Sequence, residues 1–331
     1  MNAVILAGGL GTRLRPLTDN LPKPMLKIAN VPTIDYTISH LINIGIKDFV
    51  FTLGYRASDI IDWVTNYKGI SSHFSIESYP LGTLGGVKAM EDYLSDVFIV
   101  ISGDAVENID LQSMINKHFE ADALLTMAVC EVDDTSQYGV VKLDGWGIVT
   151  DFWEKPLKGT VKSNLANTGV YIVDKKVLRG LYLDAKYDFA NDLFESLIKK
   201  QKLAAFIHDG YWQDIGSLNT FYSTNFDLKN GGFYPPAPHH KREEVLSYLP
   251  QNREETLYSV NCIVDGTALN SIIGQGSRIN YGGEVINSIV LDGVTVNNKH
   301  RNCIIGKDFI VPILVNEELR TKNEERRINY F

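Results

Sequence analysis

A repeat of apolar side chains at every sixth position constrains the fold of this chain more than any other feature of its sequence. The repeated positions are Ile273, Ile279, Val285, Leu291, Cys303 and Phe309, with Asn297 as the one interruption. Such hexads, with glycine and asparagine between them, are typical of a parallel β-helix in which each apolar residue stacks on the next coil. An antiparallel set of strands with fortuitous spacing is the alternative. The hexad rule favours a small left-handed β-helix of about three coils, each made of three hexads.

The first 229 residues follow a different pattern, in which strand-like and helix-like segments alternate. Asp48–Leu53 and Val97–Ile101 are apolar runs of the kind that form buried strands. Two amphipathic stretches have apolar residues on one helix face, namely Ile34, Ile38, Leu41 and Ile42, and then Val87, Met90 and Leu94. This alternation predicts an α/β domain with a Rossmann-like, doubly wound and mostly parallel sheet, whose ligands bind beyond the carboxyl ends of the strands.

The sequence predicts four parts of the chain. Residues 1–229 form the α/β domain, and residues 230–256 form a linker that is rich in proline, glycine and charge. Residues 257–315 form the β-helix domain. The tail, residues 316–331, balances acidic and basic side chains, which predicts a solvated surface.

Composition excludes several classes of protein. The chain has 331 residues, of which 44% are hydrophobic and 22% charged, as in ordinary globular proteins. A net charge of −8 argues against nucleic acid as a partner, because a phosphate backbone requires a basic surface. No apolar run reaches the ~18 residues of a membrane-spanning helix, and the amino terminus lacks the pattern of a secretory signal. We therefore expect a cytoplasmic protein with no membrane partner.

A segment rich in glycine, arginine and proline follows the first strand-like run and has the composition of a phosphate-binding loop. Its sequence is LAGGLGTRLRPLTDNLPKPM over residues 6–25. A dinucleotide-binding fingerprint is excluded because Leu14 stands where its third glycine belongs. A P-loop is excluded as well, since no lysine followed by serine or threonine closes the glycines.

The residues of this segment nevertheless suit a polyphosphate. Glycines allow backbone N–H groups to approach phosphate closely. Arg13 can hold two oxygens with its planar guanidinium, and Lys23, between Pro22 and Pro24, can add a point charge on a stiffened segment. A glycine-rich turn whose basic side chains face water is the alternative. Two cations in one short loop favour phosphate binding.

Residues 8–18, followed by Pro22–Pro24, resemble the signature of the sugar-1-phosphate nucleotidyltransferases, also called nucleotide-sugar pyrophosphorylases. Further motifs resemble that family in the same order along the chain: PLGTLGG (80–86), SGDA (102–105), YGVV (138–141), EKP (154–156), NTGVY (167–171) and GYWQDIGS (210–217). With the hexad repeat, the resemblance covers nearly the whole chain. The sequence looks most like the mannose-1-phosphate guanylyltransferase branch, which often carries a C-terminal β-helix.

The resemblance implies a role for each matched residue. Those implied in catalysis are Arg13, Lys23, Asp104, Lys155 and Asp214, of which Asp104 and Asp214 would hold Mg²⁺. Those implied in nucleotide binding are Leu6, Ala7, Gly8, Gly9, Gly11, Thr12, Arg13, Lys23, Pro80, Gly82 and Thr83. Those implied in sugar binding are Gly139, Glu154, Lys155, Asn167, Thr168 and Gly169.

The implied reaction joins a nucleoside triphosphate to a sugar 1-phosphate and releases pyrophosphate. Mannose 1-phosphate follows from the branch that the chain resembles. GTP is favoured because Pro80 stands near where relatives that use uridine or thymidine nucleotides commonly have a glutamine. Thymidylyl, uridylyl or adenylyl transfer to glucose 1-phosphate or heptose 1-phosphate stays open.

Two further functions also stay open. One is a catalytically weak regulatory homologue, against which the intact set of implied catalytic residues argues. The other is a bifunctional enzyme whose β-helix transfers acyl groups, for which His300 is the sole histidine in the repeat. We expect the β-helix instead to join copies of the chain into a homo-oligomer, because stacked coils have edges and ends that suit self-association.

Overall fold

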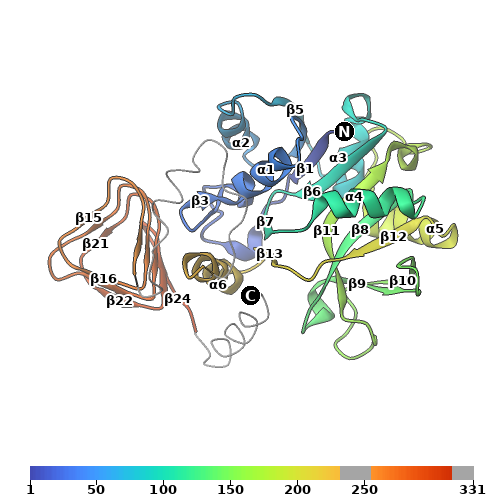
Figure 1. Ribbon diagram of the computed structural model, residues 1–331. Helices are drawn as coiled ribbons and strands as arrows, with labels where there is room; N and C mark the ends of the chain where they lie inside the picture. The colour runs from blue at the N-terminus through green and yellow to red at the C-terminus, as the bar shows by residue number, and fades with distance from the viewer. Residues whose placement is uncertain (232–254, 315–331) are drawn as a thin grey trace. The chain divides into compact units, whose positions relative to one another are not determined.

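The computed structural model describes residues 1–231 and 255–314 (Figure 1). Most of the predicted linker and the whole predicted tail, residues 316–331, lie outside the described residues. The chain divides into two compact units. The first contains residues 1–10 and 37–214, and the second contains residues 11–36 together with the residues from 215 onward.

A nine-stranded mixed sheet forms the centre of the first unit. Its strands are β1 (Ala3–Ala7), β4 (Asp48–Leu53), β5 (Ser71–Ile76), β6 (Val97–Ser102), β8 (Leu125–Glu131), β9 (Gly139–Leu143), β10 (Val149–Glu154), β11 (Leu165–Asp174) and β12 (Leu203–Ile207). Seven strands follow the order β10-β9-β11-β6-β1-β4-β5, while β8 pairs with β11 and β12. Strands β6, β1, β4 and β5 are parallel.

Both strands predicted from apolar runs are confirmed as β4 and β6, and their interiors are buried. The sheet is parallel only in part, however. β11 runs antiparallel to β6 and to β8, and β9 and β10 form an antiparallel pair. The short connection of residues 144–148 between β9 and β10 explains this pair, because a parallel pair needs a crossover of a dozen or more residues.

Four helices of the first unit lie within residues 37–214: α2 (Ala57–Val64), α3 (Gly82–Ala89), α4 (Leu111–Glu120) and α5 (Phe194–Lys199). α1 (Thr33–Asn43), within which the boundary between the units falls, confirms the first predicted helix. The second predicted helix is shorter than its apolar spacing indicates, because α3 ends at Ala89 and the buried Met90 and Leu94 lie beyond it. No helix in the described part of the chain is long and apolar enough to cross a bilayer.

A separate two-stranded ladder completes the first unit. It joins β7 (Ala105–Glu107), which follows β6 after a short turn, to β13 (Trp212–Asp214), which follows β12. The two strands are antiparallel, with Ala105 opposite Asp214 and Glu107 opposite Trp212.

The second unit contains the glycine- and proline-rich segment, residues 11–36. Within this segment β2 (Lys27–Ile28) and β3 (Val31–Pro32) form a tight antiparallel hairpin. α6 (Leu218–Lys229) belongs to the same unit and begins at a reciprocal cap. The Ser217 hydroxyl accepts from the Thr220 N–H (3.1 Å), and the Thr220 hydroxyl accepts from the Ser217 N–H (2.9 Å).

The described residues from 255 onward form stacked three-sided coils, coloured orange to red in Figure 1. On the first face β14 (Leu257–Tyr258), β17 (Ile272–Ile273), β20 (Ile289–Val290) and β23 (Cys303–Ile305) stack in parallel, and β24 (Ile310–Pro312) pairs antiparallel with β23. The second face has β15 (Ile263–Val264), β18 (Arg278–Ile279) and β21 (Thr295–Val296), and the third has β16 (Thr267–Leu269), β19 (Glu284–Ile286) and β22 (Lys299–Arg301).

The predicted β-helix is confirmed, but its coils are shorter than three full hexads. Side chains on successive coils meet at separations of 17 residues and then 15 residues along the chain. Val290, which pairs with Ile273, is therefore more fully buried than Leu291. In the same way Val296 is buried in place of Asn297, which explains the interruption of the repeat.

Replacing Ile279 by alanine should destabilise the β-helix, because Ile279 is fully buried in its core. Such a cavity costs about 2–5 kcal/mol. Ile263→Ala is the matched control, since Ile263 lies in the neighbouring strand of the same face and is 46% exposed. Thermal unfolding followed by circular dichroism compares the two variants, and equal losses of stability would contradict this core.

Candidate active site

The parallel strands of the first unit end at one edge of the sheet. Ala7, the last residue of β1, lies opposite Leu53, the last residue of β4, and Gly8 and Gly9 follow Ala7. A Cβ atom added to Gly54 would lie only 2.6 Å from the Gly8 carbonyl oxygen. The two loops therefore meet through backbone alone, which leaves N–H groups at this edge open to close approach by a ligand.

The two predicted metal-binding aspartates become neighbours at this edge. Asp104 follows β6, and its carboxylate accepts a hydrogen bond from the Ser102 hydroxyl. The next residue, Ala105, starts the β7–β13 ladder and lies directly opposite Asp214. The ladder thus brings together two carboxylates that are far apart in the sequence.

This pair of carboxylates fits Mg²⁺. The ion prefers oxygen ligands and usually takes one or two protein carboxylates, with water and substrate phosphate in its other positions. Within the described ranges, no group of three or more histidine, cysteine, aspartate or glutamate side chains is arranged to hold a metal. Asp104 and Asp214 would be the protein ligands.

A buried histidine–glutamate pair ties the ladder to α1. His40 Nδ1 lies 2.7 Å from Glu107 Oε1, and the other oxygen of Glu107 accepts from the Ile109 N–H (2.6 Å). Burial lowers the pKa of His40, but the charge and hydrogen bond of Glu107, with Asp110 nearby, outweigh this and raise the pKa above its usual value. Protonated His40 therefore stabilises the last residue of β7.

Three predicted sugar-binding residues meet where β9 and β10 pair. Gly139 lies opposite Glu154, and a Cβ atom on Gly139 would lie 2.6 Å from the Phe152 ring and 3.1 Å from Glu154 Oε2. Glycine at this position gives the Glu154 carboxylate its room. The Lys155 ammonium lies 3.4 Å from that carboxylate, and its side chain is 63% exposed, so that it can reach an anionic ligand.

The other three predicted sugar-binding residues form an irregularity in β11, where its register against β8 shifts between Asn167 and Tyr171. Gly169 supplies a φ of +80° there. The buried Thr168 hydroxyl donates to the Ala128 carbonyl oxygen (2.9 Å), so it holds the backbone. The Asn167 amide donates to the Tyr171 hydroxyl (2.8 Å) and accepts from the Gly169 N–H (3.1 Å).

Tyr171 is a residue that the sequence analysis did not assign, although it ends the NTGVY motif. Burial raises the pKa of its hydroxyl to about 12; the hydrogen bond from Asn167 opposes this shift, and the charge of Glu154 adds to it. Tyr171 therefore stays neutral and fixes the orientation of the Asn167 amide. The influence of Glu154 places it beside the residues predicted to bind the sugar.

The second predicted nucleotide loop owes its conformation to packing. Gly82 has a φ of +76°, and a Cβ atom there would lie 2.4 Å from the Tyr187 carbonyl oxygen. The N–H and hydroxyl of Thr83 both donate to Asp188 Oδ1, at 3.0 and 3.2 Å. Pro80 is exposed. The start of α3 is thus held in place by the segment that precedes Phe189.

Glu77 is a second residue that the sequence analysis missed. It follows β5 at the same edge, three residues before PLGTLGG, and its Oε2 accepts from the Leu81 N–H (3.0 Å). Burial raises the pKa of Glu77, and this hydrogen bond opposes the rise. A Cβ atom on Gly86 would lie 2.6 Å from Glu77 Oε1, so glycine leaves space for the carboxylate.

The remaining predicted residues, in the phosphate-binding segment, lie in the second unit. Gly11 has a φ of +61°, and its carbonyl oxygen accepts from the Thr18 hydroxyl (2.8 Å). Thr12–Leu14 and Lys23–Met25 each form one 3₁₀ turn. The Pro22 carbonyl oxygen accepts from the Met25 N–H (2.9 Å), so the proline-flanked lysine is part of an ordered turn, as predicted.

Comparison with protein families agrees with this arrangement. Residues 2–231 match the family described as nucleotidyl transferase. The chain belongs to this family. Residues 247–322 of the nucleotidyltransferase match the GlmU-like C-terminal hexapeptide family, in agreement with the β-helix.

Relatives with assigned activities align along nearly the full nucleotidyltransferase chain. The glucose-1-phosphate adenylyltransferase of Bacillus mycoides (strain KBAB4) is 28% identical over 356 residues, which cover 93% of this chain and 92% of the relative. The protein of the same name from Bacillus cytotoxicus is 28% identical and covers 96% of this chain and 93% of its own. The homologues are sugar-1-phosphate nucleotidyltransferases.

Solved structures match the part of the chain outside the β-helix best. HddC from Yersinia pseudotuberculosis is 31% identical, with a TM-score of 0.60 over 69% of this chain and 99% of that chain. The structure of HddC complexed with GMP-PN is 32% identical with a TM-score of 0.58. A putative glucose-1-phosphate thymidylyltransferase from Bacillus anthracis, 24% identical with a TM-score of 0.62, shares the fold.

The His40–Glu107 pair should make stability depend on pH. Because folding raises the pKa of His40, its stabilisation is fully present below its unfolded pKa of about 6.5 and is lost as pH rises through the folded pKa. His40→Gln should therefore destabilise the protein more at about pH 6 than at about pH 9. Urea unfolding at the two pH values measures this, and a difference independent of pH would contradict a protonated His40.

Proposed function

We propose that this nucleotidyltransferase transfers a nucleotidyl group from a purine nucleoside triphosphate to a hexose 1-phosphate and releases pyrophosphate. The observation that carries the proposal is the pairing of Ala105 with Asp214, which puts two aspartates at the edge where the parallel strands end. Ligands of open α/β sheets bind at that edge. Glu154 and Lys155, on the same unit, supply a hydrogen-bond acceptor and a cation for a sugar phosphate.

In the proposed reaction an oxygen of the sugar phosphate attacks the α-phosphorus of the triphosphate. A new P–O bond forms, and the bond from the α-phosphorus to the pyrophosphate oxygen breaks. The attacking oxygen is already ionised near neutral pH, so the protein supplies orientation and positive charge rather than a base. Lys155 would neutralise the sugar phosphate, and Arg13 and Lys23 would hold the triphosphate.

Mg²⁺ bound by Asp104 and Asp214 would neutralise phosphate oxygens and help to orient the triphosphate. The Ser102 hydroxyl, through its hydrogen bond to Asp104, holds one of these carboxylates in place. Glu154 would accept hydrogen bonds from sugar hydroxyls, and the fixed Asn167 and Tyr171 would limit the shape of the sugar that fits beside it.

ATP and glucose 1-phosphate are the first candidates for the substrates. The relatives that align over nearly the full chain, β-helix included, are named glucose-1-phosphate adenylyltransferases. They favour adenylyl transfer to glucose 1-phosphate over the GTP and mannose 1-phosphate that the sequence analysis favoured.

GTP is the second candidate for the nucleotide, and two observations support it. HddC was solved with GMP-PN and is 32% identical to this chain. Glu77 offers a carboxylate beside the loop predicted to face the base. A carboxylate can accept hydrogen bonds from both the ring N–H and the amino group of guanine, whereas the corresponding edge of adenine offers only an amino donor.

A pyrophosphate-release screen decides between these candidates. It crosses ATP, GTP, CTP, UTP and dTTP with glucose, mannose and heptose 1-phosphates, and the Glu77→Gln variant is measured beside the parent. Selective loss of GTP use in Glu77→Gln would assign guanine recognition to this carboxylate. Turnover with pyrimidine nucleotides alone would contradict the proposed purine specificity.

Asp104→Asn should lower turnover by about 10²-fold to 10³-fold, the effect of removing one group that stabilises charge in a transition state. Asp92→Asn is the matched control, because Asp92 is an exposed aspartate that precedes β6. Pyrophosphate release and thermal unfolding are measured for both. A near-normal rate for Asp104→Asn with an unchanged fold would overturn the assignment of the metal site.

We also propose that the β-helix joins copies of the chain. The first coil carries exposed apolar side chains at Ile263 and Leu269, which are 46% and 52% exposed. A homo-oligomer that buried them would be lost in the double variant Ile263→Glu, Leu269→Glu. Analytical ultracentrifugation checks this, and an unchanged mass would count against the proposal.

A further inference from the structure

The hairpin that follows Lys23 has an unusual turn. β2 and β3 are joined by Ala29 and Asn30, whose φ angles are +47° and +66°. Two consecutive positive φ values match the right-handed twist of a two-residue hairpin, but alanine rarely adopts this conformation. The turn therefore needs contacts from outside the hairpin to hold it.

The hairpin is continuous with the turn that carries Lys23. The Leu26 N–H donates to the Lys23 carbonyl oxygen (3.0 Å), and the N–H and hydroxyl of Thr33 donate to the Leu26 carbonyl oxygen at 2.9 and 2.8 Å. Met25 and Leu26 are buried. A shift of the hairpin would consequently shift the backbone of Lys23.

One contact that holds the hairpin comes from α6. The Ala29 N–H donates to Asn225 Oδ1 at 2.8 Å, in a buried position. The Asn225 amide in turn donates to the Phe221 carbonyl oxygen (2.9 Å), one turn earlier in α6. The side chain of Asn225 is thus fixed from both ends.

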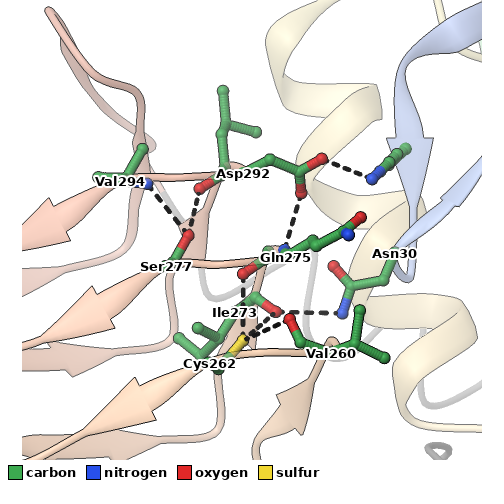
Figure 2. A network of polar contacts seen from close by, with 11 residues as sticks. Asn30, Val260, Cys262, Ile273, Gln275, Ser277, Asp292 and Val294 are labelled. Carbon is green, nitrogen blue, oxygen red and sulfur yellow. Dashed lines mark hydrogen bonds and ion pairs between the residues drawn. The ribbon is translucent and has the colours of Figure 1, made fainter.

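The other contacts come from the β-helix, and Figure 2 shows them as one network. Asp292 lies between two donors: its Oδ2 is 2.5 Å from Lys27 Nζ, and its Oδ1 accepts from the Gln275 N–H (2.9 Å). The Asn30 amide donates to the Ile273 carbonyl oxygen (3.3 Å). Two adjacent coils of the β-helix therefore hold both ends of the hairpin turn.

We propose that Asp292 of the β-helix is a positioning residue for nucleotidyl transfer, acting through Lys27 to fix the turn that carries Lys23. The inference rests on the proposed role of Lys23 in holding the triphosphate. It gives the β-helix a part in binding one substrate only, because the residues proposed to bind the sugar phosphate belong to the other compact unit.

The test uses the full-length protein and the variants Asp292→Asn and Lys27→Gln. Each should weaken binding of the magnesium complex of ATP or GTP, whichever the screen selects, by about threefold to fivefold, as for a partly exposed ion pair. The KM for the sugar 1-phosphate should stay unchanged. Isothermal titration calorimetry measures nucleotide affinity without turnover, and steady-state kinetics gives the two KM values.

Three comparisons separate positioning from a structural effect. Asp265→Asn, which removes another β-helix carboxylate 3.9 Å from Arg278, should leave nucleotide affinity unchanged. The charge exchange Lys27→Glu with Asp292→Lys should restore affinity that either single change lowers. At about 1 M salt, where charges are screened within ~3 Å, the parent and Asp292→Asn should converge.

The inference is overturned if Asp292→Asn changes both KM values together, changes neither, or behaves like Asp265→Asn. It is also overturned if Lys23→Gln leaves nucleotide affinity unaltered, or if the parent binds neither ATP nor GTP. A parent that binds nucleotide but converts no sugar 1-phosphate contradicts the proposed function instead, and the calorimetry still decides the coupling. Thermal unfolding confirms that each variant is folded.

Discussion

The proposed chemistry depends on one short antiparallel ladder between β7 and β13. Without it, Asp104 would stand alone at the end of β6, because Asp214 is reached only after the chain has built five further strands of the sheet. The ladder fixes the register, so that Asp214 lies opposite the residue that follows Asp104. The buried pair of His40 and Glu107 fastens the far end of β7 to α1. Metal ligation, if it occurs here, is thus a consequence of strand pairing.

Local patterns in the sequence predicted the parts of the molecule that local patterns govern. The apolar runs predicted β4 and β6, and the hexads predicted the β-helix. Motif order predicted the family, which the match over residues 2–231 confirms. The coil length was wrong because corners formed by asparagines with positive φ, among them Asn270 and Asn287, make each coil shorter than three hexads.

What the sequence could not give was every role that depends on a partner far along the chain. The motif PLGTLGG suggested glycines that face a nucleotide, whereas a Cβ atom on Gly82 or Gly85 would collide with carbonyl oxygens of residues 185–187. Thr168 suggested a sugar contact, yet its hydroxyl donates to the backbone of β8. Tyr171 and Glu77 were overlooked because only the fold brings them beside predicted residues.

The hairpin after Lys23 has a consequence for how the protein is made. Its partners Asn225, Ile273 and Asp292 lie 196, 243 and 265 residues from the groups they hold. At a synthesis rate of about 5–20 residues per second, the ribosome needs on the order of 10–50 s to supply them. The segment that most clearly marks the family is translated almost first, and its hairpin is among the last parts of the described chain to acquire its contacts.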